Sequence, residues 1–297
     1  MGSPMSALRS LAKALAEGPF VRHLLKIIRV LMAFLAPRRI AQALAPRPVV
    51  RAVVELSLVS LAFLLYFLVR GSVVNDAQEA IEHGTRIINL ERDFGFAWEH
   101  QMQMLILGKQ FFIQLFNFIY FWFDFPLIIV VGLWLYFHRR RQYTFTRDAM
   151  LISGGIALII YHVFPVAPPR YLPDFVDTMK QYSNLNYQAE SVRFFVNPYA
   201  AVPSLHVGWS VILAIGVITA TRFKPVWLLI GLLPVAQFFA VVLTANHYIF
   251  DAMVGVAVAL LGLAAAYFMQ RWGYTALGHL VGLDAPPASP PMKGAMA

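Results

Sequence analysis

The sequence predicts an all-α polytopic membrane protein, a bundle of six transmembrane helices with an amphipathic N-terminal helix and an interfacial helical segment. Three observations predict this fold class. Of the 297 residues, 59% are hydrophobic and 13% are charged, whereas soluble globular domains carry about 25% charged residues. Six apolar runs are long enough to cross about 30 Å of hydrocarbon. A polar stretch between the first two runs has the pattern of a helix at a membrane surface.

The N-terminal segment, residues 1–50, is basic, and its apolar stretch 20–36 is interrupted by Lys26 and Arg29. A cleavable signal peptide needs an uninterrupted apolar core. We therefore expect 20–36 to form an amphipathic helix on an anionic membrane surface, with a disordered basic tail as the alternative. The Pro-rich segment at the other end, 272–297, is predicted to be a disordered cytoplasmic tail.

The membrane catalytic domain is predicted over residues 51–271. Its six spans are 52–69, 116–138, 147–165, 204–221, 225–244 and 247–269. The stretch 75–103 is predicted to be an amphipathic helix at the interface. Within it, residues 75–100 are predicted to be solvated, with a lid over the site as the alternative, and their charged residues are Glu79, Glu82, Arg86, Glu91 and Arg92. The aromatic run 111–125 is predicted to be lipid-facing surface and an interfacial belt, or else a groove for an acyl or prenyl chain.

The distribution of Lys and Arg predicts the orientation of the spans. With the N-terminus inside, 17 of the 24 Lys and Arg residues fall on the inner segments, and inner loops carry the excess of these residues. Both termini are therefore predicted to be cytoplasmic, in the plasma membrane, with the active site on the outer face. Membrane anchoring explains the net charge of +9 better than a nucleic-acid partner.

The chain has no cysteine, which excludes disulfides, thiolate nucleophiles and cysteine-ligated zinc. Three polar patches remain as candidates for chemistry, and all three fall on the predicted outer side. The first is "FPVAPPRYLPD", residues 164–174, whose four prolines make a stiff entry to a loop. This loop presents Arg170, and a guanidinium suits bidentate binding of phosphate. An interfacial Arg that binds head groups without specificity is the alternative.

The second patch is "AVPSLHVGWS", residues 201–210. Ser204 is a natural N-cap before an apolar helix, and the first-turn amides beginning at Leu205 would form an anion site at the positive end of the helix dipole. His206, in the same turn, is placed to give a proton to a leaving group. An ordinary serine cap with an interfacial histidine is the alternative.

The third patch is "TANHYIFDAMVG", residues 244–255, in which His247 and Asp251 are four residues apart and are predicted to share a helix face. A carboxylate inside a span usually has a partner or a function. Asp251 accepting from one ring nitrogen of His247 would leave the other nitrogen for attack. A structural buried His–Asp pair is the alternative.

Asp124, in "FWFDFP" of the second span, is another intramembrane acid. It is predicted to line the active-site cavity or bind an acceptor hydroxyl, and a structural pairing, for example with His162, is equally open. His162 itself is predicted to be a satisfied core histidine.

"PSLH" at 203–206 and "HYIFD" at 247–251 resemble the second and third signatures of the type 2 phosphatidic acid phosphatase (PAP2) superfamily. The leucine at 205 and the "PPR" before the loop are similar to the branch containing inositolphosphorylceramide synthase and related inositol phosphotransferases. The resemblance covers about residues 50–270. It implies His247 as the nucleophile that forms a phosphohistidine, Asp251 as its orienting group and His206 as the general acid.

The same resemblance implies that Arg170, Ser204 and nearby amides hold the phosphoryl oxygens. It implies a six-helix core that needs no metal and no cofactor, and a lipid phosphate or phospholipid as the substrate. Two phosphate-binding cations common in phosphatases of the family are replaced here by Val163 and Val241. The residues available to compensate are Lys180, Arg193, Asn246 and Tyr248.

The leading prediction is a metal-independent phosphoesterase or phosphotransferase that acts on a membrane lipid, with a polyol or sugar as acceptor. The missing cations favour transfer to an alcohol over a simple phosphatase acting on phosphatidate or polyprenyl phosphate. The alternatives of other classes are a proton-coupled transporter that uses His247 and Asp251 as a relay, and a membrane protein that only binds partners.

Overall fold

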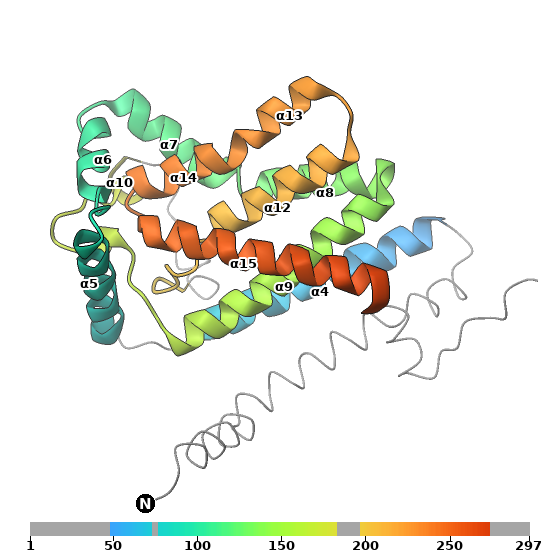
Figure 1. Cartoon of the computed structure of the whole chain (residues 1–297), viewed down its shortest axis with the longest axis horizontal. Helices are drawn as coiled ribbons and strands as arrows, with labels where there is room; N and C mark the ends of the chain where they lie inside the picture. The colour runs from blue at the N-terminus through green and yellow to red at the C-terminus, as the bar shows by residue number, and fades with distance from the viewer. Residues whose placement is uncertain (1–47, 73–76, 183–196, 274–297) are drawn as a thin grey trace, which may run out of the picture. The chain divides into compact units, whose positions relative to one another are not determined.

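The computed structural model describes residues 48–72, 77–182 and 197–273, and the regular structure in these ranges is helical throughout, which confirms the all-α prediction for them. The predicted helix 20–36 and residues 274–297 of the predicted tail lie outside the described residues. The elements, drawn in Figure 1, are α4 (Pro48–Ser72), α5 (Ala77–Asp93), α6 (Glu99–Ile106), α7 (Gln110–Trp122), α8 (Phe125–His138), α9 (Arg140–Val163), η1 (Pro169–Tyr171), α10 (Thr178–Tyr182), α12 (Leu205–Ala220), α13 (Lys224–Gly231), α14 (Leu233–Leu243), α15 (Ile249–Phe268) and η2 (Met269–Gly273).

Contacts divide the chain into two compact units. One consists of Met1–Phe63 with Trp272–Ala297, and its described part is the beginning of α4 and the end of η2. The other is Leu64–Arg271, which contains every helix that carries a candidate site residue.

Three helical stretches in the described residues are long and apolar enough to cross a membrane: Arg140–Val163, Lys224–Leu243 and Ile249–Trp272. A fourth is counted if α7 and α8, bent by 44° at their junction, form one broken span. The prediction of six spans is therefore not confirmed. The helix α12 has 16 residues, which give about 24 Å of rise. Its N-terminal end, at Ser204, is buried in the protein.

The break between α7 and α8 has a local cause. Pro126 stands in the first turn of α8 and has no N–H to continue the hydrogen-bond ladder of α7. The chain therefore turns at Asp124, the residue that precedes α8. The side chain of Asp124 is buried at this bend.

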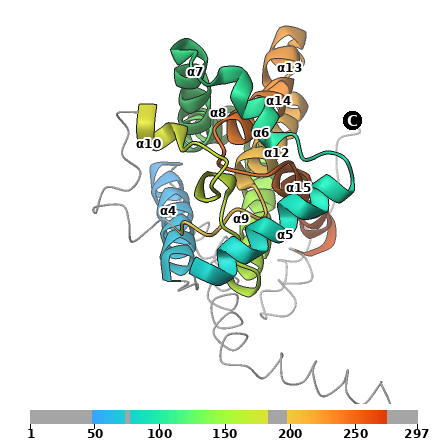
Figure 2. The same ribbon diagram turned by 90° about the vertical axis from the view of Figure 1, so that its left-hand side faces the viewer.

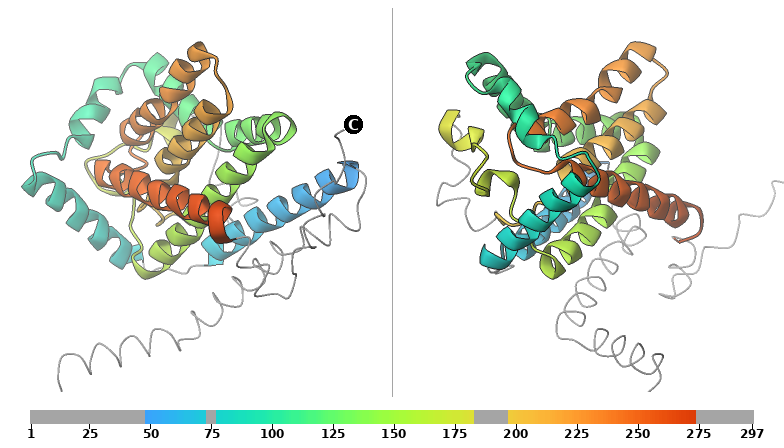
Figure 3. Two further views of the ribbon diagram at one scale, coloured as in Figure 1. Left: turned by 45° about the vertical axis from the view of Figure 1, so that its right-hand side comes forward. Right: turned by 60° about the vertical axis from the view of Figure 1, so that its left-hand side comes forward.

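Small residues pack α9, α12 and α15 against one another (Figure 1). A Cβ added to Gly255 of α15 would lie 2.1 Å from the Ser204 carbonyl oxygen, and one added to Gly208 of α12 would lie 2.6 Å from the Gly255 carbonyl oxygen. Close approach of helix backbones at such residues is the usual packing of membrane helices. Figure 3 shows α14 beside α12, and α7 packs against α14 in turn.

The predicted interfacial helix is two helices, α5 and α6, because Gly95 turns the chain at φ +80°. Figure 2 shows α5 crossing one end of the bundle. Its exposed face carries Glu79, Glu82 and Arg86, as predicted, but Glu91 is fully buried. The buried stripe that ends at Glu91 repeats every three or four residues (Ala80, His83, Gly84, Ile87 and Glu91).

The packing of α12 on α15 predicts a strong dependence on Gly255. Gly255→Ala is expected to lower the stability of the purified protein by about 1–3 kcal/mol, because the new methyl group overlaps the Ser204 carbonyl. Thermal unfolding in detergent measures the effect. Gly132→Ala in α8 is the matched control, since a Cβ there would meet no atom within 4 Å. Equal stability of the two variants would contradict this packing.

Candidate active site

Backbone hydrogen bonds join the three polar patches at one end of α12 and α15. The Arg170 N–H donates to the Ala245 carbonyl at 2.9 Å, and the Ser204 N–H donates to the Asp251 carbonyl at 3.0 Å. The extended segments that precede Arg170 and Ser204 also pair, through an isolated parallel bridge between Val166 and Ala200. Backbone bonds therefore hold together segments that lie up to about 80 residues apart. The sequence had predicted only that the three patches lie on the same side of the membrane.

The turn that precedes α15 is built by the end of α14. The Asn246 N–H donates to the Val241 carbonyl at 2.9 Å and the Ala245 N–H donates to the Val242 carbonyl at 3.0 Å, the two bonds of a Schellman motif. Ala245 has φ +55°, at the position where glycine is usual. The chain reverses here and brings His247 to the start of α15.

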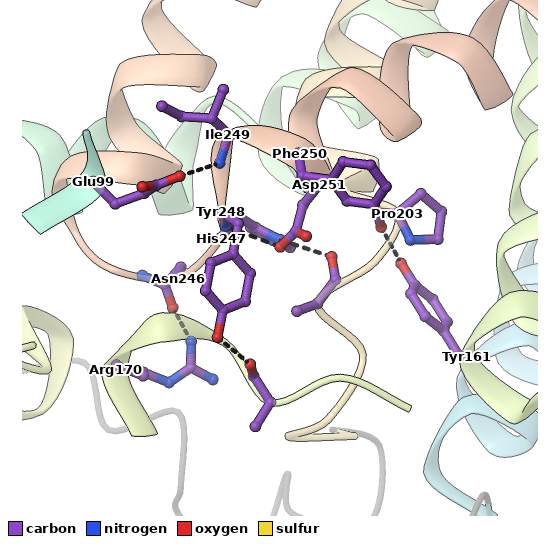
Figure 4. Close-up of polar contacts among 12 residues, drawn as sticks. Glu99, Tyr161, Arg170, Pro203, Asn246, His247, Tyr248, Ile249, Phe250 and Asp251 are labelled. Carbon is purple, nitrogen blue, oxygen red and sulfur yellow. Dashed lines mark hydrogen bonds and ion pairs between the residues drawn. The ribbon is translucent and has the colours of Figure 1, made fainter. Parts of the chain in front are cut away.

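His247 is held through its Nδ1 atom (Figure 4). Nδ1 lies 2.8 Å from the Ala201 carbonyl oxygen and 3.3 Å from Asp251 Oδ2. Because both groups are acceptors, Nδ1 carries the proton and the lone pair is on Nε2. The predicted pair is present, but the two residues do not share a helix face, since His247 lies in the turn and Asp251 in the first turn of α15.

His206 lies beside His247, with 5.7 Å between the ring centroids. Its Nε2 is 3.3 Å from Asp124 Oδ2, and the Tyr120 ring stacks on its imidazole at 4.4 Å. Asp124 thus pairs with His206. His162, the partner considered from sequence, is exposed on α9 and is not the core histidine that was predicted.

Arg170 is anchored next to the His247 turn. Its guanidinium donates to Asn246 Oδ1, and its Nε lies 3.8 Å from Asp177 Oδ2. The Asn246 amide is oriented by a bond from its Nδ2 to Thr244 Oγ1 at 2.7 Å. The arginine is therefore fixed to the residue that immediately precedes His247.

Ser204 occupies the N-cap position of α12, as predicted, but its side chain caps no backbone amide. Its hydroxyl is fully buried and has no hydrogen-bond partner among the described residues. The first bond of the helix is donated by the Gly208 N–H to the Ser204 carbonyl at 3.0 Å. The amides of Leu205, His206 and Val207 precede this bond at the positive end of the helix.

The other candidates take different places. The Tyr248 side chain is buried and its hydroxyl donates to the Ala167 carbonyl at 2.9 Å, which gives it a packing role. Lys180 is exposed on α10, and Arg193 lies outside the described residues. Of the two valines at the missing cation positions, Val163 is exposed and Val241 is buried in an apolar cluster.

Sequence reasoning missed two acids. Glu99 accepts the Ile249 N–H at 2.8 Å and Glu91 accepts the Phe250 N–H at 2.7 Å, so both cap the helix that follows His247. Glu91 was predicted to lie on a solvated face, and Glu99 was not among the predicted site residues. The signal for Glu91 was its place on the buried stripe of α5.

Comparison with known proteins places the chain in a family. A family model described as "PAP2 superfamily" matches residues 85–265. The chain is 31% identical over 156 residues to a phosphoinositol dihydroceramide synthase of Bacteroides thetaiotaomicron. The aligned region covers 46% of this chain and 50% of that protein. The chain thus spans about half the length of this curated relative. No solved structure matches the chain.

The unpaired hydroxyl of Ser204 leads to a prediction about stability. Ser204→Ala is expected to keep or raise the stability of the purified protein, by up to about 1 kcal/mol, because it removes a buried polar atom without a partner. Thermal unfolding in detergent tests this. The control is Ser153→Ala, which removes a buried hydroxyl that accepts from Trp209 Nε1 and donates to the Met150 carbonyl. Destabilisation by both variants alike would contradict the expectation.

Proposed function

The chain belongs to the PAP2 superfamily, and we propose that it moves a phosphorylated head group from a membrane lipid to an alcohol, or to water, through a phosphohistidine on His247. The observation that carries this proposal is the fixed tautomer of His247. Two acceptors on Nδ1 leave the lone pair on Nε2, which is the form a nucleophile needs.

The first step forms a P–N bond and breaks a P–O bond. Nε2 of His247 attacks phosphorus while the oxygen of the leaving lipid departs, and His206 gives its proton to that oxygen. The neighbouring Asp124 carboxylate stabilises the protonated ring that this step requires.

The second step reverses the roles. The hydroxyl oxygen of the acceptor forms a new P–O bond as the P–N bond breaks, and its proton passes to His206. The Asp251 carboxylate and the Ala201 carbonyl hold the Nδ1 proton throughout. Both residues start the next cycle in their original protonation states.

The phosphoryl oxygens require donors that are already in place, because charge on them is spread through the transition state. Arg170 supplies a guanidinium beside the His247 turn. The amides of the first turn of α12 and the unpaired hydroxyl of Ser204 supply further donors. Asn246 accepts a hydrogen bond from Arg170 and so holds the guanidinium in place; its proposed role is to position the arginine and not to bind the phosphate directly.

The acceptor is an alcohol in this proposal, and simple hydrolysis is the alternative. The name of the Bacteroides relative describes a product in which phosphoinositol is joined to dihydroceramide. We therefore include lipid hydroxyls among the acceptors, together with inositol and sugar alcohols. The proposed location is the plasma membrane, with cytoplasmic termini and the site on the outer face, as the Lys and Arg distribution predicts.

The proposal predicts the behaviour of His247→Ala. Purified protein in detergent, without added metal, is offered phospholipid and lipid phosphate donors, with inositol, a sugar alcohol, dihydroceramide or no acceptor. Mass spectrometry follows free phosphate and new phosphodiesters. We expect an acceptor-dependent phosphodiester, lost by at least about 10³-fold in His247→Ala and unchanged in His162→Ala, whose histidine is exposed on α9.

Other outcomes of this experiment separate the alternatives. Free phosphate formed without an alcohol, and lost in His247→Ala, would identify a phosphatase. An acid-labile phosphoryl group on the peptide containing His247 in the wild type supports the intermediate. Turnover unaffected by His247→Ala would exclude His247 as the nucleophile, and a wild type that turns over none of the donors would favour the transporter class.

The contact between Asp124 and His206 predicts a dependence on the leaving group. Asp124→Asn is expected to lower kcat by about 10–100-fold for an alkyl phosphoester, because general-acid catalysis contributes about 10²–10⁴-fold. For a p-nitrophenyl ester of the same head group, p-nitrophenolate departs without needing a proton, so kcat should decrease little. Steady-state kinetics on both esters measure this, with Asp93→Asn, on an exposed position of α5, as control. Equal losses on both esters would assign Asp124 a structural role.

A further inference from the structure

Two buried glutamates from different helices cap the start of α15. Glu99 of α6 accepts the Ile249 N–H and Glu91 of α5 accepts the Phe250 N–H. Figure 4 shows Glu99 reaching Ile249 directly after the His247–Tyr248 turn. Both side chains are fully buried, so neither carboxyl group is stabilised by solvent.

The remaining oxygen of each glutamate is buried. Glu91 Oε2 and Glu99 Oε2 have no hydrogen-bond partner among the described residues, and the side chains that carry them cap consecutive amides of α15. A hydrogen bond between the two groups needs a proton on one of them, since two carboxylates offer only acceptors. Two buried charges on neighbouring amides would also repel strongly.

We propose that Glu91 and Glu99 share one proton and act as a positioning pair, which clamps the N-terminus of α15 and thereby fixes His247 and Asp251 in the catalytic turn. One oxygen of each glutamate accepts from a backbone amide, and the other oxygen binds the shared proton. The pair thus ties α5, α6 and α15 together at Ile249 and Phe250, two and three residues beyond His247.

The electrostatics agree with this geometry. Burial, as the largest cause, and the neighbouring Glu99 carboxyl group together raise the pKa of Glu91 from its ordinary 4.5 to about 9. The Phe250 N–H acts in the opposite direction. The titratable groups facing the pair from α15 and its N-cap are Asp251, whose charge also raises the pKa of Glu91, and Tyr248. Glu91 is therefore neutral at pH 7.

A double-mutant cycle tests the shared proton. In Glu91→Gln or Glu99→Gln, one amide oxygen still caps α15 and the amide nitrogen donates to the remaining carboxylate, so at pH 5 each single variant should melt within about 2 °C of the wild type. In the double variant two NH₂ groups face each other, and one side chain must abandon its cap. Its Tm should fall by at least about 4 °C below both single variants. Glu82→Gln, exposed on α5, is the control.

The pH dependence of stability gives a second readout. Between about pH 4.5 and pH 9 the unfolded chain has lost the Glu91 proton and the folded chain retains it, so the free energy of unfolding of the wild type decreases across this window. Glu91→Gln lacks this dependence. The Tm of Glu91→Gln minus that of the wild type should therefore increase steadily from pH 5 to pH 9.

The positioning role rests on the proposed function and is measured separately. Glu91→Ala should lower kcat by about 10–100-fold with little change in KM, because misplacing a reacting group by about 1 Å costs this much, and Glu91→Gln should restore it. A double variant as stable as the single ones, or a Glu91→Gln variant as impaired in Tm as Glu91→Ala, would overturn the shared proton. If His247→Ala left turnover intact, the proposed function would fail, while the stability cycle would still report on the pair.

Discussion

The start of α15 is buried, and the rest of the site depends on how its backbone amides are satisfied. An unpaired helix terminus inside a protein is strongly unfavourable. Here the Tyr248, Ile249 and Phe250 amides are taken by Asp251, Glu99 and Glu91. Two of these acids come from helices outside the main bundle. The turn that carries His247 is thus held by the same bonds that close the helix, and α5 and α6 help to support the candidate site.

The close packing of α12 on α15 places the two histidines within reach of each other. Gly208 and Gly255 remove the side chains that would separate the backbones, and the Ser204 amide bonds directly to the Asp251 carbonyl. His206 then falls in the first turn of one helix and His247 just before the other. A residue with any side chain at Gly255 would separate these helix ends, so the glycine determines the distance between the proposed acid and the proposed nucleophile.

The sequence predicted those parts of the molecule whose physics is local or periodic. The apolar composition predicted helices, and the His247–Asp251 spacing predicted a contact that the structure contains, although from a turn and not from a helix face. The bend at Asp124 was not predicted, because 116–138 was predicted to be one span, and the pairing of Asp124 with His206 depends on the tertiary fold. Glu91 and Glu99 were missed because charged residues on an amphipathic pattern normally indicate a solvated face. The six predicted spans are not confirmed, and one of them, α12, has a buried N-terminal end that hydropathy does not reveal.

The charge of the site argues for the class of phosphoester it binds. A phosphate monoester carries close to two negative charges at neutral pH and a phosphodiester carries one, so the former needs more cationic neutralisation. Val241 is buried among Val207, Val242 and Ala252, where a cation would be unstable, and Val163 is exposed. Arg170 is itself partly balanced by Asp177. In the described part of the chain, the site has one guanidinium and helix amides, which match a singly charged diester and favour the proposed transfer of a head group over release of phosphate from a monoester.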